Sequence, residues 1–234
     1  TPDYTLGCKR ILISRDYLPA LAQPNVDVVT DGIREVTENA IITEDGTVHE
    51  VDTIIYGTGF HVTDPPYAKG VFDDAGRSAA EVFEKTGPRA HLGTTISGFP
   101  NLFLMLGPNS GSGHTSMIMV IESQLELVLQ AFRHARDHKV GVIDPRPEAQ
   151  AKWIEDVDKD AEGTVWTTGG CSSWYNDASG RNATLWPGSI AAQRKVLRFR
   201  TQEYRMVTER KSPVKAGAET ESPPDTRAAC PART

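Results

Sequence analysis

The sequence is poor in cysteine and has no long apolar run. Its three cysteines, Cys8, Cys171 and Cys230, lie far apart and form no CxxC pair, so neither a zinc site nor a dithiol redox centre is predicted. No apolar stretch has the length of a transmembrane helix, and no signal-peptide pattern precedes Tyr4. These absences predict a cytoplasmic protein without a membrane partner.

The chain also lacks an excess of positive charge. Its formal net charge is -6 and its pI is near 5.5, which argues against nucleic acid or an anionic membrane as the main partner. Basic residues gather between Arg194 and Lys211, but Glu203 and Glu209 interrupt them. This stretch is therefore predicted to be a solvated helix face. The apolar content of 38% and charged content of 24% are those of an ordinary globular chain.

Two segments join a continuous apolar run to a glycine-rich turn: Asp52–Phe60, DTIIYGTGF, and Asn101–Met117, NLFLMLGPNSGSGHTSM. Continuous apolar runs are typical of buried strands, here Thr53–Tyr56 and Asn101–Leu106. In open α/β sheets, ligands bind beyond the carboxyl ends of strands, where glycine lets a cofactor approach the backbone. Both turns are candidate cofactor contacts, although a tight turn requires the same glycines.

The second turn matches only part of the dinucleotide fingerprint GxGxxG. Gly111, Gly113 and Ser116 have its spacing, and a helical pattern follows. The third glycine is a serine, however, and no ribose-binding acid is evident. A self-contained Rossmann fingerprint is therefore not predicted.

Local patterns predict several further elements. The turn Glu44-Asp45-Gly46 favours a hairpin, and short alternating segments predict strands at Val26–Thr30, Ile33–Thr37, Ala40–Thr43 and Val48–Val51. A long buried helix is predicted from Thr115 to about His138, because apolar residues recur there at helical spacing: Ile118, Ile121, Leu125, Val128, Leu129 and Phe132.

The last third of the chain changes in character. Glu148–Asp160 predicts an amphipathic helix, and Arg136, His138 and Lys139 supply the cations expected at the end of the preceding helix. Trp166–Pro187 is rich in Gly, Ser, Asn and Trp, which predicts an ordered but irregular segment. The residues beyond Ser212 include almost no large apolar side chains, so a disordered tail is predicted.

Five segments in this order resemble the C-terminal half of class B flavoprotein monooxygenases, and are most similar to Baeyer-Villiger and flavin-containing monooxygenase-like enzymes. The resemblance reaches about residue 205, and its segments are TPDYTLGCKRILISRDYLPAL, NVDVVTDGIREVTENAIITEDG, VDTIIYGTGFHVTD, ISGFPNLFLMLGPNSGSGHTSMIMVIESQ and VWTTGGCSSWYNDASGRNATLWPGS. It implies an α/β fold: the C-terminal part of a flavoprotein with two dinucleotide-binding domains, with a mixed sheet, a small antiparallel β layer and a long buried helix.

Members of this class also carry a GxGxxG turn for FAD, a second one for NADPH and a fingerprint between them, none of which occurs in this sequence. Together with Thr1 in the first position, this predicts a C-terminal fragment. On this interpretation, residues 1–25 cross over from a missing NADP domain and residues 26–145 form the C-terminal part of the FAD-binding domain. Residues 146–210 form a helical and irregular segment, and residues 211–234 form the tail.

The resemblance implies FAD, NADPH and O2 as reactants with a small organic substrate. One oxygen would pass through a C4a-peroxyflavin to a ketone, giving an ester, or to nitrogen or sulfur. Arg10 is implied as the catalytic residue, because its guanidinium keeps its charge and can hold the peroxide oxygens and an oxyanion. Lys9 would pair with the 2'-phosphate of NADPH. Without the family context, this Lys-Arg pair would be ordinary surface charge.

The resemblance also implies flavin contacts at both glycine-rich turns. Backbone N–H groups at the start of the long helix would stabilise negative charge near N1 and O2 of the reduced flavin. An ordinary N-cap by Ser112 or Thr115 explains the same residues. Gly57 replaces the alanine usual in the family's first turn. The implied cofactor-binding set is Lys9, Gly57, Thr58, Gly59, Gly107, Pro108, Asn109, Gly113, His114, Thr115 and Ser116.

Aromatic residues near the end of the resemblance are candidates for the substrate pocket. Trp166, Trp174 and Tyr175 are similar to residues that line it, as is Trp186, with core packing as the alternative for at least two of the four. The histidines, among them His61, His91 and His114, lack the spacing of a metal site, so no metal is predicted.

Two alternative functions stay open. One is a different flavoprotein with two dinucleotide domains, such as a thioredoxin reductase-like oxidoreductase, against which the missing CxxC pair counts. The other is a non-catalytic remnant that binds a partner or part of FAD. The sequence fixes neither the substrate nor the oligomeric state, and leaves a homo-oligomer open.

Overall fold

The structure is a computed structural model that describes residues 4–59, 62–170 and 173–208. The predicted tail, His61, Cys171 and Cys230 lie outside the described residues. In chain order, the helices, 3-10 helices (η) and strands are α1 (Tyr17–Leu21), β1 (Ile33–Val36), β2 (Ala40–Thr43), β3 (Val48–Glu50), η1 (Pro66–Lys69), α2 (Ala79–Thr86), α3 (Met117–His138), β4 (Val140–Pro145), α4 (Pro147–Ala161), α5 (Val165–Thr168), α6 (Ile190–Val196), η2 (Thr201–Glu203) and β5 (Tyr204–Thr208).

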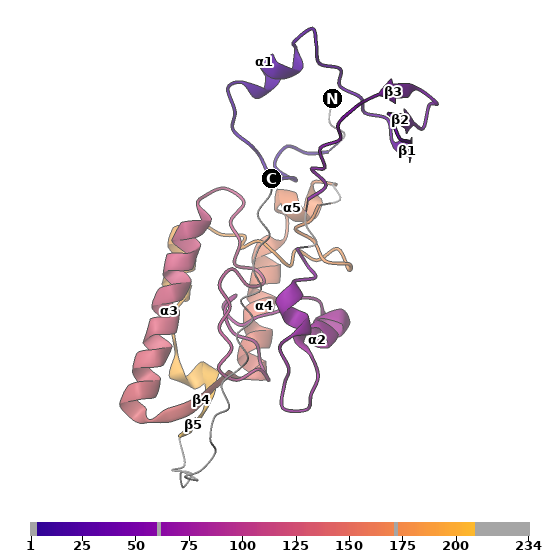
Figure 1. Ribbon diagram of the computed structural model, residues 1–234. Coiled ribbons are helices and arrows are strands. Elements are labelled where there is room, and N and C mark those ends of the chain that lie inside the picture. Colours follow the sequence, from indigo (N-terminus) through magenta and orange to yellow (C-terminus); the bar gives the residue numbers. More distant parts are fainter. Residues whose placement is uncertain (1–3, 60–61, 171–172, 209–234) are drawn as a thin grey trace, which may run out of the picture.

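Figure 1 shows two regions along the molecule. The helix α1 and the small sheet β1–β3 lie at one end, and α2, α3, α4 and the β4–β5 pair form the other part, with α5 between them. The buried apolar clusters are all in this second part: one around Phe83 and Phe99, one around Leu127, and one around Ile143 and Tyr204. The hydrophobic core of the described chain therefore begins after the first glycine-rich turn.

The sheet β1–β2–β3 is antiparallel, and its second turn follows the sequence prediction. Asp45 holds the turn, because its carboxylate accepts hydrogen bonds from the Thr43 hydroxyl at 2.5 Å and from the backbone N–H of Thr47 at 3.0 Å. The Thr43 hydrogen bond, with those from Thr47, lowers the pKa of Asp45 to about 2. Gly46 follows with φ 86°, a conformation that favours glycine. The hairpin is thus confirmed.

Three predicted strands do not form. Val26–Thr30 and Thr53–Tyr56 are exposed coil, and Asn101–Leu106 is irregular. Asn101 and Leu106 have positive φ angles of 60° and 57°, which end an extended conformation at both ends of that segment. Both described sheets are antiparallel, so the described part of the chain forms small antiparallel sheets and not the predicted mixed sheet.

The long helix forms nearly as predicted, as α3. Ser116 caps it by accepting a hydrogen bond from the N–H of Ile118 at 3.3 Å, and Lys139 ends it in the left-handed conformation. The buried side chains share only Val128 with the predicted apolar set: they are Val120, Ser123, Gln124, Leu127, Val128 and Ala131.

The predicted apolar face of α3 is mostly in contact with solvent. Of its six residues only Val128 is buried, and Ile118, Leu125 and Phe132 are 62%, 48% and 54% exposed. The prediction of a helix buried on that face is therefore wrong for the described structure. The helix carries two apolar faces, and the described chain covers one of them.

The elements after residue 146 agree with the sequence predictions in part. The helix α4 confirms the one predicted at Glu148–Asp160. The segment after Trp166 is irregular as predicted, apart from the short helix α5. The basic stretch after Arg194 is not a solvated helix face, because it contains the end of α6 and the strand β5, which pairs antiparallel with β4. No helix in the described ranges has the length and apolar character needed to cross a bilayer.

A buried histidine in this core predicts pH-dependent stability. His91 is buried, with its Nε2 3.2 Å from the Glu203 carboxylate and its ring edge-on to Tyr204. Burial lowers the pKa of His91, although Glu203 opposes the shift. The unfolded state then binds more protons than the folded state below about pH 6.5, so the free energy of unfolding should fall as the pH decreases through that value.

Urea unfolding at pH 7 and pH 5 measures this effect. The variant His91→Gln should lose part of the pH dependence, and the exposed His138→Gln should keep it. An unchanged pH dependence in His91→Gln would assign the effect to other groups.

Candidate functional site

The second glycine-rich turn, residues 106–112, is held by buried amide side chains from two helices. Gln124 of α3 accepts a hydrogen bond from the N–H of Leu106 at 2.8 Å and donates to the carbonyl of Gly93 at 2.8 Å. Gln193 of α6 donates to the carbonyl of Ser110 at 3.0 Å. Both amides are buried, where an unpaired polar group is costly, so these contacts fix the path of the turn.

Asn109 joins this turn to a segment that comes much later in the chain. It has φ 56°, and its side-chain amide donates to the carbonyls of Asn182 at 2.7 Å and Leu185 at 3.3 Å. Its own N–H donates to Ala183 at 2.9 Å, and the N–H of Gly111 donates to Thr184 at 3.0 Å. The turn therefore lies along residues 182–185 like a short extra strand.

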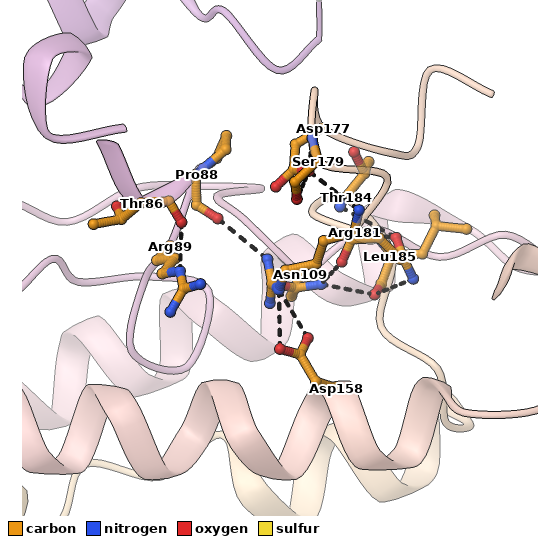
Figure 2. Close-up of polar contacts among 11 residues, drawn as sticks. Thr86, Pro88, Arg89, Asn109, Asp158, Asp177, Ser179, Arg181, Thr184 and Leu185 are labelled. Carbon is orange, nitrogen blue, oxygen red and sulfur yellow. Dashed lines mark hydrogen bonds and ion pairs between the residues drawn. The ribbon is translucent and has the colours of Figure 1, made fainter. Parts of the chain in front are cut away.

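Arg181 completes this connection (Figure 2). Its Nε lies 2.9 and 3.0 Å from the two carboxylate oxygens of Asp158 on α4, and its Nη2 donates to Oδ1 of Asn109 at 2.8 Å. A weaker contact of 3.5 Å joins Nη1 to the carbonyl of Pro88. The Arg181 side chain is 13% exposed and that of Asp158 is 42% exposed. The turn, the 182–185 segment and α4 thus meet at one guanidinium.

Close packing explains Gly107 of the second turn and Gly113, which follows that turn. A Cβ added at Gly107 would lie 2.6 Å from the carbonyl oxygen of Gly93, and one at Gly113 would lie 2.7 Å from the ring of Trp166. Neither position has room for a side chain. The tight-turn alternative therefore accounts for these glycines without a cofactor.

The first glycine-rich turn is different. A Cβ added at Gly57 or Gly59 would meet no atom within 4 Å among the described residues. Gly59 has φ 83°, which by itself favours glycine, whereas Gly57 does not lie in the left-handed region. Packing within the described chain gives no reason for glycine at Gly57.

Residues 112–116 form a separate small turn before α3. The Ser112 hydroxyl accepts hydrogen bonds from the N–H groups of Thr115 at 3.1 Å and His114 at 3.4 Å. The N-cap of α3 is Ser116, not Ser112 or Thr115. The expected cap is therefore displaced by one to four residues, while the positive end of the helix stays next to the predicted flavin contacts.

Arg10 reaches this turn from the other end of the chain. Its Nη1 donates to the carbonyl oxygen of Ser112 at 2.8 Å, across 102 sequence positions. Lys9 points elsewhere, with its Nζ 4.4 Å from the centre of the Tyr4 ring. The neighbouring Cys8 is buried and disulfide-bonded, which the cysteine spacing did not predict.

The candidate pocket aromatics fall into two groups. Tyr175 and Trp186 are buried, and Trp186 stacks on Trp153 with the ring centres 5.5 Å apart, so both pack in the core. Trp174 is exposed and lies over the Tyr175 ring, with 4.3 Å between the ring centres. Trp166 is half-buried against Gly113, and thus touches the turn before α3.

The smaller of two hollows adjoins the second turn. A cavity of about 80 Å³ joins Leu106, Gly107 and Pro108 to Val62 and Thr63, which follow the first turn. The other is an open groove of about 970 Å³ between α2 and the loop at Asp177–Ser179. Within the described ranges, no three His, Cys, Asp or Glu side chains form a group that could hold a metal ion.

The sequence analysis missed the residues that hold the site together. Arg181, Asp158, Gln124 and Gln193 belong to no motif, and their partners lie 18 to 93 positions away in the chain. The sequence offered one signal: Gln124 is a polar residue within the pattern of a long helix. The structure shows that this position is buried.

Known proteins resemble this chain in sequence. No protein-family model matches the chain. A Baeyer-Villiger monooxygenase of Streptomyces coelicolor is 48% identical over 222 residues, which are 93% of this chain and 42% of that protein. One of Pseudomonas aeruginosa is 45% identical over 210 residues, 89% of this chain and 40% of that protein. An FAD-binding monooxygenase of Aspergillus niger is 35% identical and matches 87% of this chain and 34% of that protein.

Solved structures agree with these relatives. Oxidized steroid monooxygenase bound to NADP superimposes with a TM-score of 0.74 at 26% identity, over 89% of this chain and 40% of that one. Cyclohexanone monooxygenase from Rhodococcus sp. Phi1 bound to NADP+ gives a TM-score of 0.73 at 28% identity, over 86% of this chain and 39% of that one.

In fold and in sequence, the chain is thus similar to part of several FAD-binding monooxygenases. More narrowly, the chain is homologous to a partial segment of the Baeyer-Villiger and related FAD-binding monooxygenases, which confirms the family resemblance. It spans about two fifths of the curated bacterial Baeyer-Villiger relatives it matches.

The Arg181 contacts predict a large loss of stability on truncation. Arg181→Met should lower the free energy of unfolding by about 1–3 kcal/mol, because it leaves the buried Oδ1 of Asn109 without this donor and breaks the fork to Asp158. Arg181→Lys should recover only part, because an ammonium cannot reproduce the fork.

Urea unfolding measures these changes. The control is Arg136→Met, which removes an exposed pair with Asp137 at 2.8 Å and should leave the free energy of unfolding nearly unchanged. Equal losses for Arg181→Met and Arg136→Met would show that the clamp at Asn109 adds nothing.

Proposed function

We propose that this chain supplies part of the active site of an FAD- and NADPH-dependent monooxygenase. The reaction inserts one oxygen atom of O2 into a small organic substrate, and either converts a ketone to an ester or oxidises nitrogen or sulfur. The observation that carries the proposal is the 2.8 Å hydrogen bond from Arg10 to the carbonyl of Ser112. It brings the candidate catalytic arginine to the turn that precedes α3.

The donor chemistry of this corner fits a reduced flavin. FAD, when bound, supplies the redox chemistry with O2, and the protein supplies position and charge. The guanidinium of Arg10, which contacts Ser112, and the N-terminal end of α3, which begins after Ser116, are both positive and adjoin residues 112–116. Negative charge that develops on a ligand between them would be stabilised from two directions.

Arg10 has the capacity for a second task. A guanidinium has five N–H donors, and the carbonyl of Ser112 takes one of them. Anchoring through Nη1 orients the planar group while the side chain stays exposed at its outer edge. In this position Arg10 would hold an oxyanion of the substrate by charge-assisted hydrogen bonds.

The remaining site residues have separate roles in this proposal. Gly57, Thr58 and Gly59 offer an open backbone surface for the flavin, and Gly113, His114, Thr115 and Ser116 present the end of α3. Gly107, Pro108 and Asn109 are buried, so they would act by fixing the turn. Lys9 would bind the 2'-phosphate of NADPH, after release of its contact with Tyr4. Trp166 and Trp174, with Tyr175 behind Trp174, would line the substrate side.

A single methyl group at Gly57 tests the cofactor surface. Gly57→Ala should leave the melting temperature unchanged, because its Cβ meets no atom of the described chain within 4 Å. If the flavin approaches the backbone there, the same change should weaken FAD binding by about tenfold. Quenching of flavin fluorescence and the visible spectrum of the purified chain mixed with FAD measure the affinity.

The matched control for this test is Gly70→Ala, whose Cβ would make an ordinary 3.8 Å contact with Tyr67. Gly70→Ala should change neither stability nor FAD affinity. An FAD affinity that is the same in Gly57→Ala and in the unaltered chain would remove Gly57 from the cofactor site. Absence of flavin binding by the unaltered chain would show that this chain does not hold the cofactor by itself.

Arg10 is tested by the product formed under air. With FAD, NADPH and a cyclic ketone, Arg10→Ala should lose ester formation by about 10²-fold or more, because an oxyanion donor acts mainly in the transition state. FAD affinity should change little, and Arg10→Lys should recover only part of the rate. Ester formation at the original rate in Arg10→Ala would exclude Arg10 as the catalytic residue, whereas oxidised sulfides or amines without ester would select the other substrate class.

A further inference from the structure

The segment that carries Arg10 is attached to the rest of the described structure at very few places. Residues 9–15 donate and accept no backbone hydrogen bond with any other described residue, and all of them are exposed. Between residues 4 and 39, Cys8 alone is buried, with 1% of its surface exposed. Cys8 therefore determines where the exposed segment leaves the body of the protein.

Cys8 is docked on the end of α5. The N–H of Thr5 donates to the carbonyl of Gly169 at 3.2 Å, and the N–H of Cys8 donates to the carbonyl of Thr5 at 3.1 Å, which closes a turn. A Cβ added at Gly169 would lie 2.9 Å from Sγ of Cys8 and 2.3 Å from the carbonyl oxygen of Val165. Because no side chain fits at Gly169, the sulfur can lie directly against the backbone there.

The helix α5 also contacts the turn to which Arg10 binds. A Cβ added at Gly113 would lie 2.7 Å from the ring of Trp166, which belongs to α5. Arg10 follows Cys8 by two residues and donates to the carbonyl of Ser112 at 2.8 Å. Two residues of extended chain span at most about 7 Å. With Cys8 fixed on α5, the guanidinium therefore stays within reach of the turn, which one hydrogen bond of an exposed side chain would not ensure.

A covalent bond makes this docking firm. Cys8 is disulfide-bonded, and the other cysteines of the chain are Cys171 and Cys230. A disulfide excludes the conformations in which its two cysteines are apart. A segment with so few other contacts would adopt such conformations readily without the bond. The disulfide of Cys8 thus holds in place the segment that carries Arg10.

The surroundings of Cys8 also favour cleavage of this bond. Lys9 and Arg10 follow Cys8 directly, and positive neighbours stabilise a thiolate. A stabilised thiolate is a better leaving group in thiol–disulfide exchange. Because residues 9–15 lack backbone partners, local opening there gives a reductant access without unfolding of the core.

We propose that the disulfide bond of Cys8 is a redox-sensitive lock, which makes Cys8 a positioning residue for Arg10. A dithiol reductant breaks the S–S bond: its two sulfur atoms take up two electrons and two protons and become thiols, while the dithiol closes to a disulfide. Arg10 then leaves Ser112. A small-molecule disulfide takes the electrons back and restores the lock. This inference concerns the position of Arg10 and goes beyond the proposed oxygenation, so its test needs neither FAD nor NADPH.

Trypsin cleavage after Arg10 measures the lock, because a held segment is cut only when it opens. The folded chain is treated with dithiothreitol, freed of the reagent and digested briefly. Mass spectrometry after treatment of a parallel sample with iodoacetamide gives the fraction of Cys8 that is reduced. Reduction should speed cleavage after Arg10 by at least about tenfold, and reoxidation with glutathione disulfide should restore the original rate. Cleavage after the exposed Lys69 should not change.

Cysteine variants supply the controls. Cys8→Ser should be cleaved after Arg10 at the reduced rate under both conditions. Of Cys171→Ser and Cys230→Ser, the one that behaves in the same way identifies the partner, and the other is the matched control. Circular dichroism separates release of the segment from unfolding, and reduction of the unaltered chain carries the test if Cys8→Ser does not fold. A disulfide that dithiothreitol does not reduce in the folded chain, or a reduced Cys8 with unchanged cleavage after Arg10, would overturn the proposal.

Discussion

The described structure depends on one buried guanidinium. Arg181 joins the carboxylate of Asp158 on α4 to the amide of Asn109, and Asn109 in turn joins the second glycine-rich turn to residues 182–185. The turn itself has neither helix nor strand geometry, so its conformation is imposed from outside. Gln124 and Gln193 add two further fixed points. Removal of Arg181 would leave the buried Oδ1 of Asn109 without this donor at the place where these segments of the chain meet.

The two glycine-rich turns look alike in sequence but differ in physical character. In the second, glycine is required because a backbone oxygen or an indole ring occupies the space of a side chain, at Gly107 and Gly113. In the first, the space beside Gly57 is empty, so the described chain does not explain the residue. Similar glycine patterns therefore have different physical causes in the two turns.

The sequence predicted those elements whose causes are local. The hairpin at Asp45 depends on hydrogen bonds within five residues, and α3 and α4 follow from helical spacing and end signals. Burial was predicted less well, because apolar periodicity shows that a face will be covered but not by what. The predicted burial of Thr53–Tyr56 and of the apolar face of α3 at Ile118, Leu125 and Phe132 was wrong for this reason. Arg181 was missed because its partners Asp158 and Asn109 are 23 and 72 positions away.

The long separation between the turn and its fixed points has a consequence for synthesis of the chain. Ser110 and its partner Gln193 are 83 positions apart, and Asn109 and Leu185 are 76 positions apart. At ordinary translation rates, the ribosome needs roughly 4–17 s to add 83 residues. During that time α3 is made and supplies the anchor at Gln124, but the anchors at residues 182–185 and Gln193 are still missing. The turn is thus completed late in synthesis, and any stop between residues 113 and 180 would produce a chain that has the turn without Arg181, residues 182–185 and Gln193.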